Sequence, residues 1–270
     1  MLKKALTGIF ALTLASYANA STTTFTTQNW DFSSNNVSVT GGSSNSQINM
    51  SAGGVNVKVT AWSSTGEGAC NSGPECGNTF RRDTDPFIER AQLTNYSSGL
   101  GAINEDESDN SPNHAIDSRG QNRDEKDFDM VLFSFDEAVE LTAINIGWTG
   151  GYDSDASILG YQGGTDLGST PFSGNTKWSD LLNQGWDFRQ DSFNIGVGSE
   201  AVSSGFESKY WLVGVYNPVF GGSVNHEGND VFKLRSISTQ LTHRTEVPEP
   251  ATFALLLAGV AAVFRRKTKA

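Results

Sequence analysis

The stretch Val55-Asn56-Val57-Lys58-Val59-Thr60-Ala61 places an apolar side chain at every second position. A period of two is typical of a β-strand that buries one face and exposes the other. The same spacing recurs further along the chain, at Val131, Phe133, Phe135, Val139 and Leu141. We therefore expect these segments to be half-buried strands.

Three further segments favour strands by composition. Residues 143–148, 210–216 and 232–241 are rich in β-branched and aromatic residues, and clusters of Gly, Asn, Asp and Ser separate them. The sequence thus predicts an all-β domain, a β-sandwich of jelly-roll type. A β-propeller is the competing architecture, but the chain has no internal repeat of blade length. Residues 33–54, rich in Ser, Thr and Asn, fit either a strand pair or a partly disordered arm.

One segment has helical spacing. In residues 176–184, Trp178, Leu181 and Leu182 stand at positions i, i+3 and i+4, behind Thr176 as a possible N-cap. We expect a short helix there that covers a sheet edge or the end of a barrel.

The amino end has the three parts of a secretory signal peptide. Lys3 and Lys4 precede an apolar run, and Ala18-Asn19-Ala20 supplies a cleavage site with small residues at Ala18 and Ala20. We predict that residues 1–20 are removed before Ser21. The alternative, a first transmembrane helix, is disfavoured because the apolar run is short.

The carboxyl end also has three parts. Val247-Pro248-Glu249-Pro250 leads into the apolar run 251–264, which a basic end, 265–269, follows. A helix of these 14 residues reaches about 21 Å, short of the roughly 30 Å hydrocarbon core of a bilayer. The positive-inside rule keeps the basic end in the cytoplasm, so residues 21–246 should form the exported domain.

This tail, residues 247–270, resembles the PEP-CTERM domain, with Pro248, Glu249 and Pro250 as its sorting motif. The resemblance implies a membrane-inserted precursor that a membrane-embedded exosortase recognises and cuts in a Gram-negative-type envelope. It also implies a protein of the cell surface or medium, in cells that produce exopolysaccharide. Segments of residues 129–161 resemble the body of exosortase-dependent surface proteins, which implies a β-sandwich without assigned activity or catalytic residues.

The exported domain is strongly acidic. Six of the 19 basic residues lie in the terminal segments, so 13 remain against 30 acidic residues when Glu249 is kept, and the net charge falls from −11 to −17. Such a charge repels phosphate backbones and anionic lipid, which argues against nucleic-acid binding and favours metal cations. Its length of about 230 residues suits one all-β domain.

Cys70 and Cys76 are the only two cysteines. In an oxidising exported compartment they most simply form a disulfide, which would stabilise the glycine-rich turn of residues 66–77 by roughly 2 kcal/mol. A zinc site is the weaker interpretation, because a second Cys pair is lacking.

Carboxylates concentrate between residues 104 and 155. We single out Asp153 and Asp155, on a glycine-rich turn, together with Asp117 and Asp129 if the fold brings those loops together. Calcium takes six to eight oxygen ligands in flexible geometry and is the ion such a site would hold. The alternative is a solvated acidic loop, which we favour for residues 105–109. No stretch matches the EF-hand loop.

Catalytic motifs are missing from the sequence. It has no G-x-S-x-G, no H-E-x-x-H and no Walker loop. His114 and Asp117 could form an acid–base pair, but a hydrogen-bonded loop histidine is the simpler interpretation. Among the tryptophans, Trp148 and Trp211 should lie in the core, whereas Trp178 and Trp186 could be exposed and stack on sugar.

The sequence therefore predicts a non-enzymatic, exosortase-sorted protein that associates with extracellular polysaccharide or the cell envelope. Two alternatives stay open. One is a secreted polysaccharide-modifying enzyme that uses a carboxylate pair among the four aspartates, and the other is a calcium-dependent carbohydrate-binding module.

Overall fold

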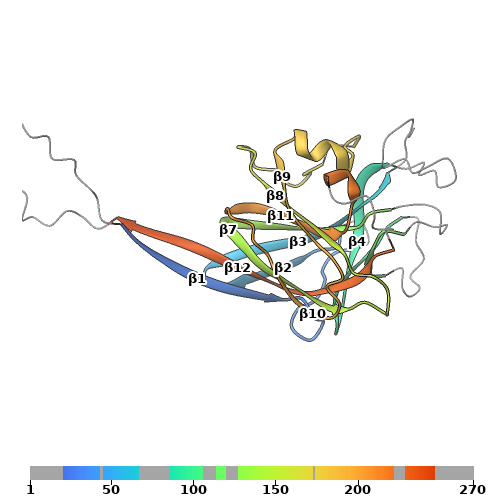
Figure 1. Ribbon diagram of the computed structural model, residues 1–270, viewed down its shortest axis with the longest axis horizontal. Helices are drawn as coiled ribbons and strands as arrows, with labels where there is room; N and C mark the ends of the chain where they lie inside the picture. Colours follow the sequence, from blue (N-terminus) through green and yellow to red (C-terminus); the bar gives the residue numbers. More distant parts are fainter. Residues whose placement is uncertain are drawn as a thin grey trace, which may run out of the picture. The chain divides into compact units, whose positions relative to one another are not determined.

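The structure is a computed structural model that describes residues 21–42, 45–66, 86–105, 114–119, 127–172, 174–221 and 229–246. Almost all of its regular structure is β (Figure 1). The strands are β1 (Ser21–Asp31), β2 (Ile48–Ala52), β3 (Val55–Gly66), β4 (Phe87–Tyr96), β5 (Gly99–Ile103), β6 (Ile116–Asp117), β7 (Met130–Trp148), β8 (Ala156–Tyr161), β9 (Trp186–Ser192), β10 (Gly198–Ala201), β11 (Ser208–Val215) and β12 (Val231–Glu246). The described residues also form the short 3₁₀ helices η3 (Trp178–Asn183) and η4 (Pro218–Phe220).

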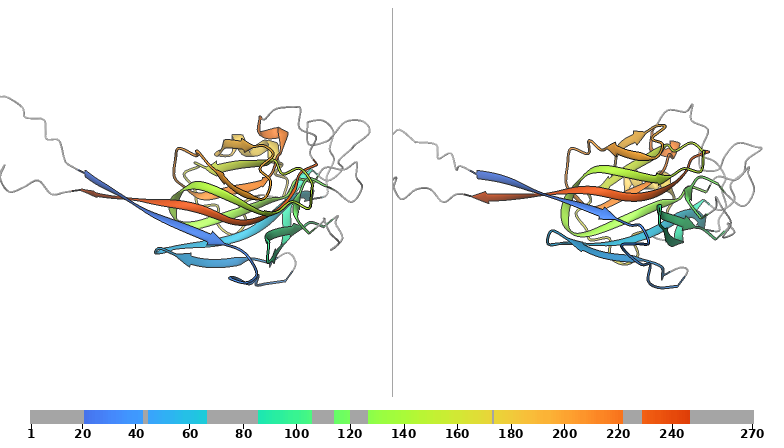
Figure 2. Two further views of the ribbon diagram at one scale, coloured as in Figure 1. Left: turned by 60° about the horizontal axis from the view of Figure 1, so that its bottom comes forward. Right: turned by 90° about the horizontal axis from the view of Figure 1, so that it is seen from below.

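The strands pair in the order β1-β12-β5-β4-β3-β7-β11-β8-β9. An additional pairing joins β12 to β7, which closes β12, β5, β4, β3 and β7 into a ring of five strands. β2 and β10 extend it by pairing with β3 and β7, and the views of Figure 2 show the strands wrapping around a common interior. The all-β prediction is confirmed and the core is a closed five-stranded barrel, while the β-sandwich of jelly-roll type stays a prediction.

β7 is the strand that closes the ring. Its first part, Met130 to Phe135, pairs with β3 on one side and β11 on the other, and its last part, from Glu140 to Trp148, pairs with β12. One strand of 19 residues therefore serves both sides of the barrel. The sequence predicted it as separate short strands, because the charged Glu137 interrupts the apolar alternation between Phe135 and Val139.

The apolar face predicted at β3 and β7 forms the core. Val55, Val57 and Val59 are buried, and so are Phe133 and Phe135. Their aromatic rings contact β1 and the residue after it: Trp30 lies edge-on to Phe135 at 5.6 Å between ring centres, and Phe32 lies 5.4 Å from Phe133. Burying each such side chain contributes roughly 1.5–3 kcal/mol, so this interior supplies the main driving force for folding.

The segment of residues 33–54, left open by its composition, contains β2, which pairs with β3 from Ile48↔Val59 to Ala52↔Val55. The segment therefore supplies one strand of a pair, and the partner strand β3 begins just after it at Val55. An isolated bridge between Thr40 and Gln47 precedes it.

The predicted helix at residues 176–184 is shorter than expected and of another type. It is the 3₁₀ helix η3, and its N-cap is Lys177 in place of Thr176. The Asp180 carboxylate accepts a hydrogen bond from the Lys177 backbone N–H at 3.0 Å, which fixes the first turn. Trp178 and Leu181 are buried, so this short helix contributes two large side chains to the core.

Trp178 and Trp186 are not exposed, contrary to the stacking alternative. Their exposed fractions are 1% and 3%, and both rings pack against Phe172. The Trp178 indole N–H donates to the Phe128 carbonyl at 3.1 Å, which satisfies its polar atom inside the core. Neither ring offers a face to a sugar.

Several predictions fall on residues outside the described ranges. They are the signal peptide, the Cys70–Cys76 disulfide, and the sorting segment with its apolar run 251–264. No helix within the described part of the chain is long and apolar enough to cross a membrane. Contacts gather residues 25–241 into one compact unit, and the described residues 21–24 and 242–246 lie outside it.

Candidate functional site

Three carboxylates meet where the turn after β7 approaches the start of β12. Asp153, Asp155 and Asp230 each present an oxygen, and these oxygens lie within 4.8 Å of one another. The backbone brings them together, because Asp153 forms a parallel bridge with Asp230 and its carbonyl accepts from the Val231 N–H at 2.9 Å. We call Asp153, Asp155 and Asp230 the acidic triad.

Backbone amides fix the triad side chains. Asp230 Oδ1 accepts from the Asp155 N–H at 2.8 Å, and Asp155 Oδ1 accepts from the Asn194 N–H at 2.6 Å. Asp155 and Asp230 are each 1% exposed, whereas Asp153 is half-buried. Carboxylates this close repel one another, and a divalent cation with oxygen ligands would offset that repulsion. The donor set fits a hard cation.

The negative potential of this region reaches Tyr216, which is fully buried. Burial raises the pKa of the Tyr216 hydroxyl, and the carboxylates of Asp191, Asp155 and Asp230 raise it further. A phenol held neutral beside carboxylates is consistent with a site that attracts positive charge.

Asp117 and Asp129 form a separate pair. The Asp117 N–H donates to Asp129 Oδ2 at 3.3 Å, and the Asp129 N–H donates to the Asp117 carbonyl at 3.0 Å. Asn104 Nδ2 also donates to Asp129 Oδ1, at 3.5 Å. Burial and the neighbouring Asp117 charge raise the pKa of the Asp129 carboxyl well above its usual range.

The four predicted ligands therefore divide into two places. Asp153 and Asp155 share the triad with Asp230, and within the described residues Asp117 and Asp129 do not join a group of three. The backbone of the Asp117–Asp129 pair nevertheless lies near that of the triad, since Val231, the residue after Asp230, lies opposite Asp117 in the β6–β12 pairing. Sequence reasoning missed Asp230. Its only signal is an aspartate just before a predicted strand, and 75 residues separate it from Asp155.

His114 packs against an aromatic ring. Its imidazole lies 4.9 Å from the Tyr96 ring centre, at an interplanar angle of 37°. The proposed His114–Asp117 acid–base pair stays a prediction, while the contact with Tyr96 gives the histidine a packing role.

Comparison with known proteins matches one segment of the chain. Residues 246–267 match the family model of the PEP-CTERM protein-sorting motif. No curated protein and no solved structure matches the chain. This motif implies recognition by an exosortase and export to the cell surface, so the chain is a protein that carries a PEP-CTERM sorting motif at its carboxyl end.

Proposed function

We propose that this protein is a non-enzymatic surface or secreted protein that associates with extracellular polysaccharide or the cell envelope after exosortase processing. The sorting motif at residues 246–267 carries the proposal. A body made of strands, with a net negative charge and hydrogen-bonding loops, supports a role in binding or structure outside the cell.

Burial argues against the enzyme alternative at the predicted carboxylates. A glycosidase needs two carboxyl groups in a cleft that admits the sugar chain. Asp117 and Asp129 are 0% exposed and Asp155 is 1% exposed, so a glycan could not reach them without a rearrangement of the barrel end. This supports a binding role over catalysis.

The sorting proposal is tested by deleting residues 248–270 and expressing both forms in a host that has an exosortase. The full chain should be shortened at its carboxyl end and should reach the cell surface or medium. The truncated chain should lose that processing, because the residues that the exosortase reads are absent. Mass spectrometry of the carboxyl end and fractionation of the cells measure both. Identical processing and location of the two forms would refute the proposal.

We further propose that the acidic triad binds calcium, which would hold the turn after β7 against the start of β12. Calcium at 100 times its Kd should add about 2.7 kcal/mol to the free energy of unfolding. Thermal melting of the full chain, in calcium and in EDTA, measures this gain. Asp230→Asn should abolish the gain, because it removes one triad carboxylate.

Glu200→Gln is the matched control, since Glu200 lies outside the triad. It should melt as the parent does in both buffers. Equal melting of the parent protein in calcium and EDTA would remove the calcium proposal, and an unchanged calcium effect in Asp230→Asn would place the ion elsewhere.

A further inference from the structure

Two cavities adjoin on the surface of the strands. One is lined by β2, β3, β7 and β11, and the other by β7, β11 and the loop that follows β8. Their volumes are about 460 and 410 Å³, within the range of small-ligand sites. Both are bounded by Asp166 and Tyr210, so they meet there as one trough. We call it the sheet groove. Its polar side chains include Ser51, Asn56, Lys58, Ser134, Asp136 and Asp166.

Strand register lines up the groove residues. Lys58 lies opposite Asn49 of β2 on one side and opposite Ser134 of β7 on the other, and Ser134 lies opposite Tyr210 of β11. One polar row therefore crosses four strands. Residues two apart on a strand share a face, about 7 Å apart, so Ser51 and Asp136 belong to a second row.

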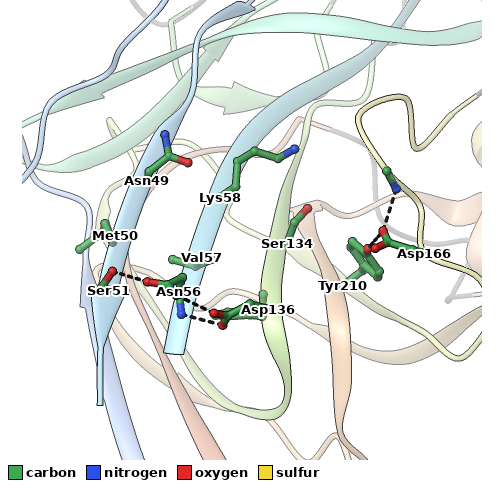
Figure 3. Close-up of a pocket in the computed structure, with 12 residues that line it drawn as sticks. Asn49, Met50, Ser51, Asn56, Val57, Lys58, Ser134, Asp136, Asp166 and Tyr210 are labelled. Carbon is green, nitrogen blue, oxygen red and sulfur yellow. Dashed lines mark hydrogen bonds between the residues drawn. The ribbon is translucent and has the colours of Figure 1, made fainter. Parts of the chain in front are cut away.

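The second row is preorganised by hydrogen bonds (Figure 3). The Ser51 hydroxyl donates to Asn56 Oδ1 at 2.5 Å, and the Asn56 backbone N–H donates to Asp136 Oδ1 at 2.7 Å. Beyond Lys58 and Ser134, the Tyr210 hydroxyl donates to the Asp166 carboxylate. A ligand that enters the groove meets side chains already held in place on a rigid sheet, which lowers the entropic cost of binding.

Both groove carboxylates are acceptors at neutral pH. The Asn56 backbone N–H lowers the pKa of the Asp136 carboxyl, and the Tyr210 hydroxyl lowers that of Asp166. Burial raises the pKa of Tyr210 to about 12, so its hydroxyl keeps the proton that it donates. Each carboxylate has lone pairs to spare, because two oxygens offer about four acceptor positions.

The groove carries both signs of charge, with two lysines against three carboxylates, because Glu207 also lines it. Lys58 and Lys209 oppose Asp136 and Asp166, and the Lys209 ammonium donates to the Asp136 carbonyl at 2.6 Å. A polyanion would gain little from so mixed a surface, and the acidic chain as a whole repels it. Alternating donors and acceptors suit hydroxyl groups, which do both. The chemistry fits a neutral chain that carries many hydroxyls.

We propose that the sheet groove binds a neutral polysaccharide, whose hydroxyl groups bond to the two polar rows. This assignment rests on the proposed association with polysaccharide and gives it a location. Two adjoining cavities suit a chain of several sugar units better than a single sugar.

The test is affinity electrophoresis of the full chain in gels that contain dextran or hydroxyethylcellulose, which are neutral, or alginate, which is a polyuronate. At least one neutral polymer should retard the parent protein. Asp136→Ala and Lys58→Ala should each weaken that binding by about tenfold, the size expected for losing hydrogen bonds to a charged group.

Glu137→Ala is the matched control, because Glu137 is the next carboxylate along β7, is exposed and does not line the groove. It should bind as the parent does. Melting curves check that each variant folds, and Asn56→Ala replaces any variant that does not.

The outcomes separate the two proposals. Retardation by a neutral polymer that the groove variants leave unchanged would overturn the groove and keep the association with polysaccharide. Retardation by alginate alone would overturn the choice of a neutral ligand. Parent protein that no polymer retards would overturn both the groove and the association with polysaccharide.

Discussion

Asp129 is a fully buried carboxyl group next to a second carboxyl group, Asp117. Because the pKa of Asp129 is raised on folding, the unfolded chain loses this proton at a lower pH than the folded protein does. From the unfolded value, about 3.9, up to the folded value, rising pH therefore lowers the free energy of unfolding. At neutral pH this residue therefore destabilises the fold, whereas at a pH below the pKa of the unfolded chain it has no such effect.

Replacing this carboxyl by an amide should stabilise the protein. Asp129→Asn keeps an oxygen that can accept from the Asp117 N–H but carries no charge. We expect its free energy of unfolding at pH 7 to exceed that of the parent by about 1 kcal/mol or more, the scale of single substitutions. Urea unfolding between pH 3 and 7 measures the difference, which should vanish toward the acid end.

Glu137→Gln is the control for this series, because Glu137 is an exposed residue of the same strand region. It should leave stability close to that of the parent throughout. A less stable Asp129→Asn at every pH would contradict the expectation and would mean that the charge itself is used, for instance by a bound cation.

At the scale of elements, β5 shows why some strands escape prediction. Its sequence Gly99-Leu100-Gly101-Ala102-Ile103 has two glycines, which are poor strand formers. The structure needs both. A Cβ at Gly99 would lie 2.5 Å from the Leu234 carbonyl oxygen, and one at Gly101 would lie 1.9 Å from that of His114. Strand propensity therefore disfavours β5 because of its two glycines, whereas the close approach of neighbouring backbones leaves no room for any side chain there.

Gly101→Ala tests this packing. The added methyl group must displace the His114 backbone, which leads into β6 and Asp117. We expect a loss of about 1–3 kcal/mol in the free energy of unfolding, as for other overpacked sites. Urea unfolding measures it. Gly42→Ala is the matched control, because a Cβ there meets nothing within 4 Å. Equal stability of the two variants would show that the loop yields freely.

At the scale of the whole molecule, the sorting motif and the candidate binding sites lie in different parts of the chain. The sorting motif occupies residues 246–267, whereas the acidic triad and the sheet groove belong to the unit of residues 25–241. The motif directs the protein to its location, and the unit of residues 25–241 has to supply the protein's function after export. Loss of the motif should therefore change location while leaving calcium and polysaccharide binding intact.

The sequence by itself determined the all-β fold class and the sorting of the protein by its PEP-CTERM motif. Alternation at Val55, Val57 and Val59 is a local property of a strand with one wet face, and the Pro-Glu-Pro tail is read as a linear segment. Neither depends on distant contacts.

Only the tertiary structure decided which polar residues meet. Asp230 joins Asp155 across 75 residues, and Lys58, Ser134 and Tyr210 line up across three strands. These neighbours follow from strand order and register, which closure of the ring through β7 and β12 sets. Periodicity shows which face of a strand is buried but carries no information on which strand lies beside it. For that reason the triad and the groove could not be read from the chain alone.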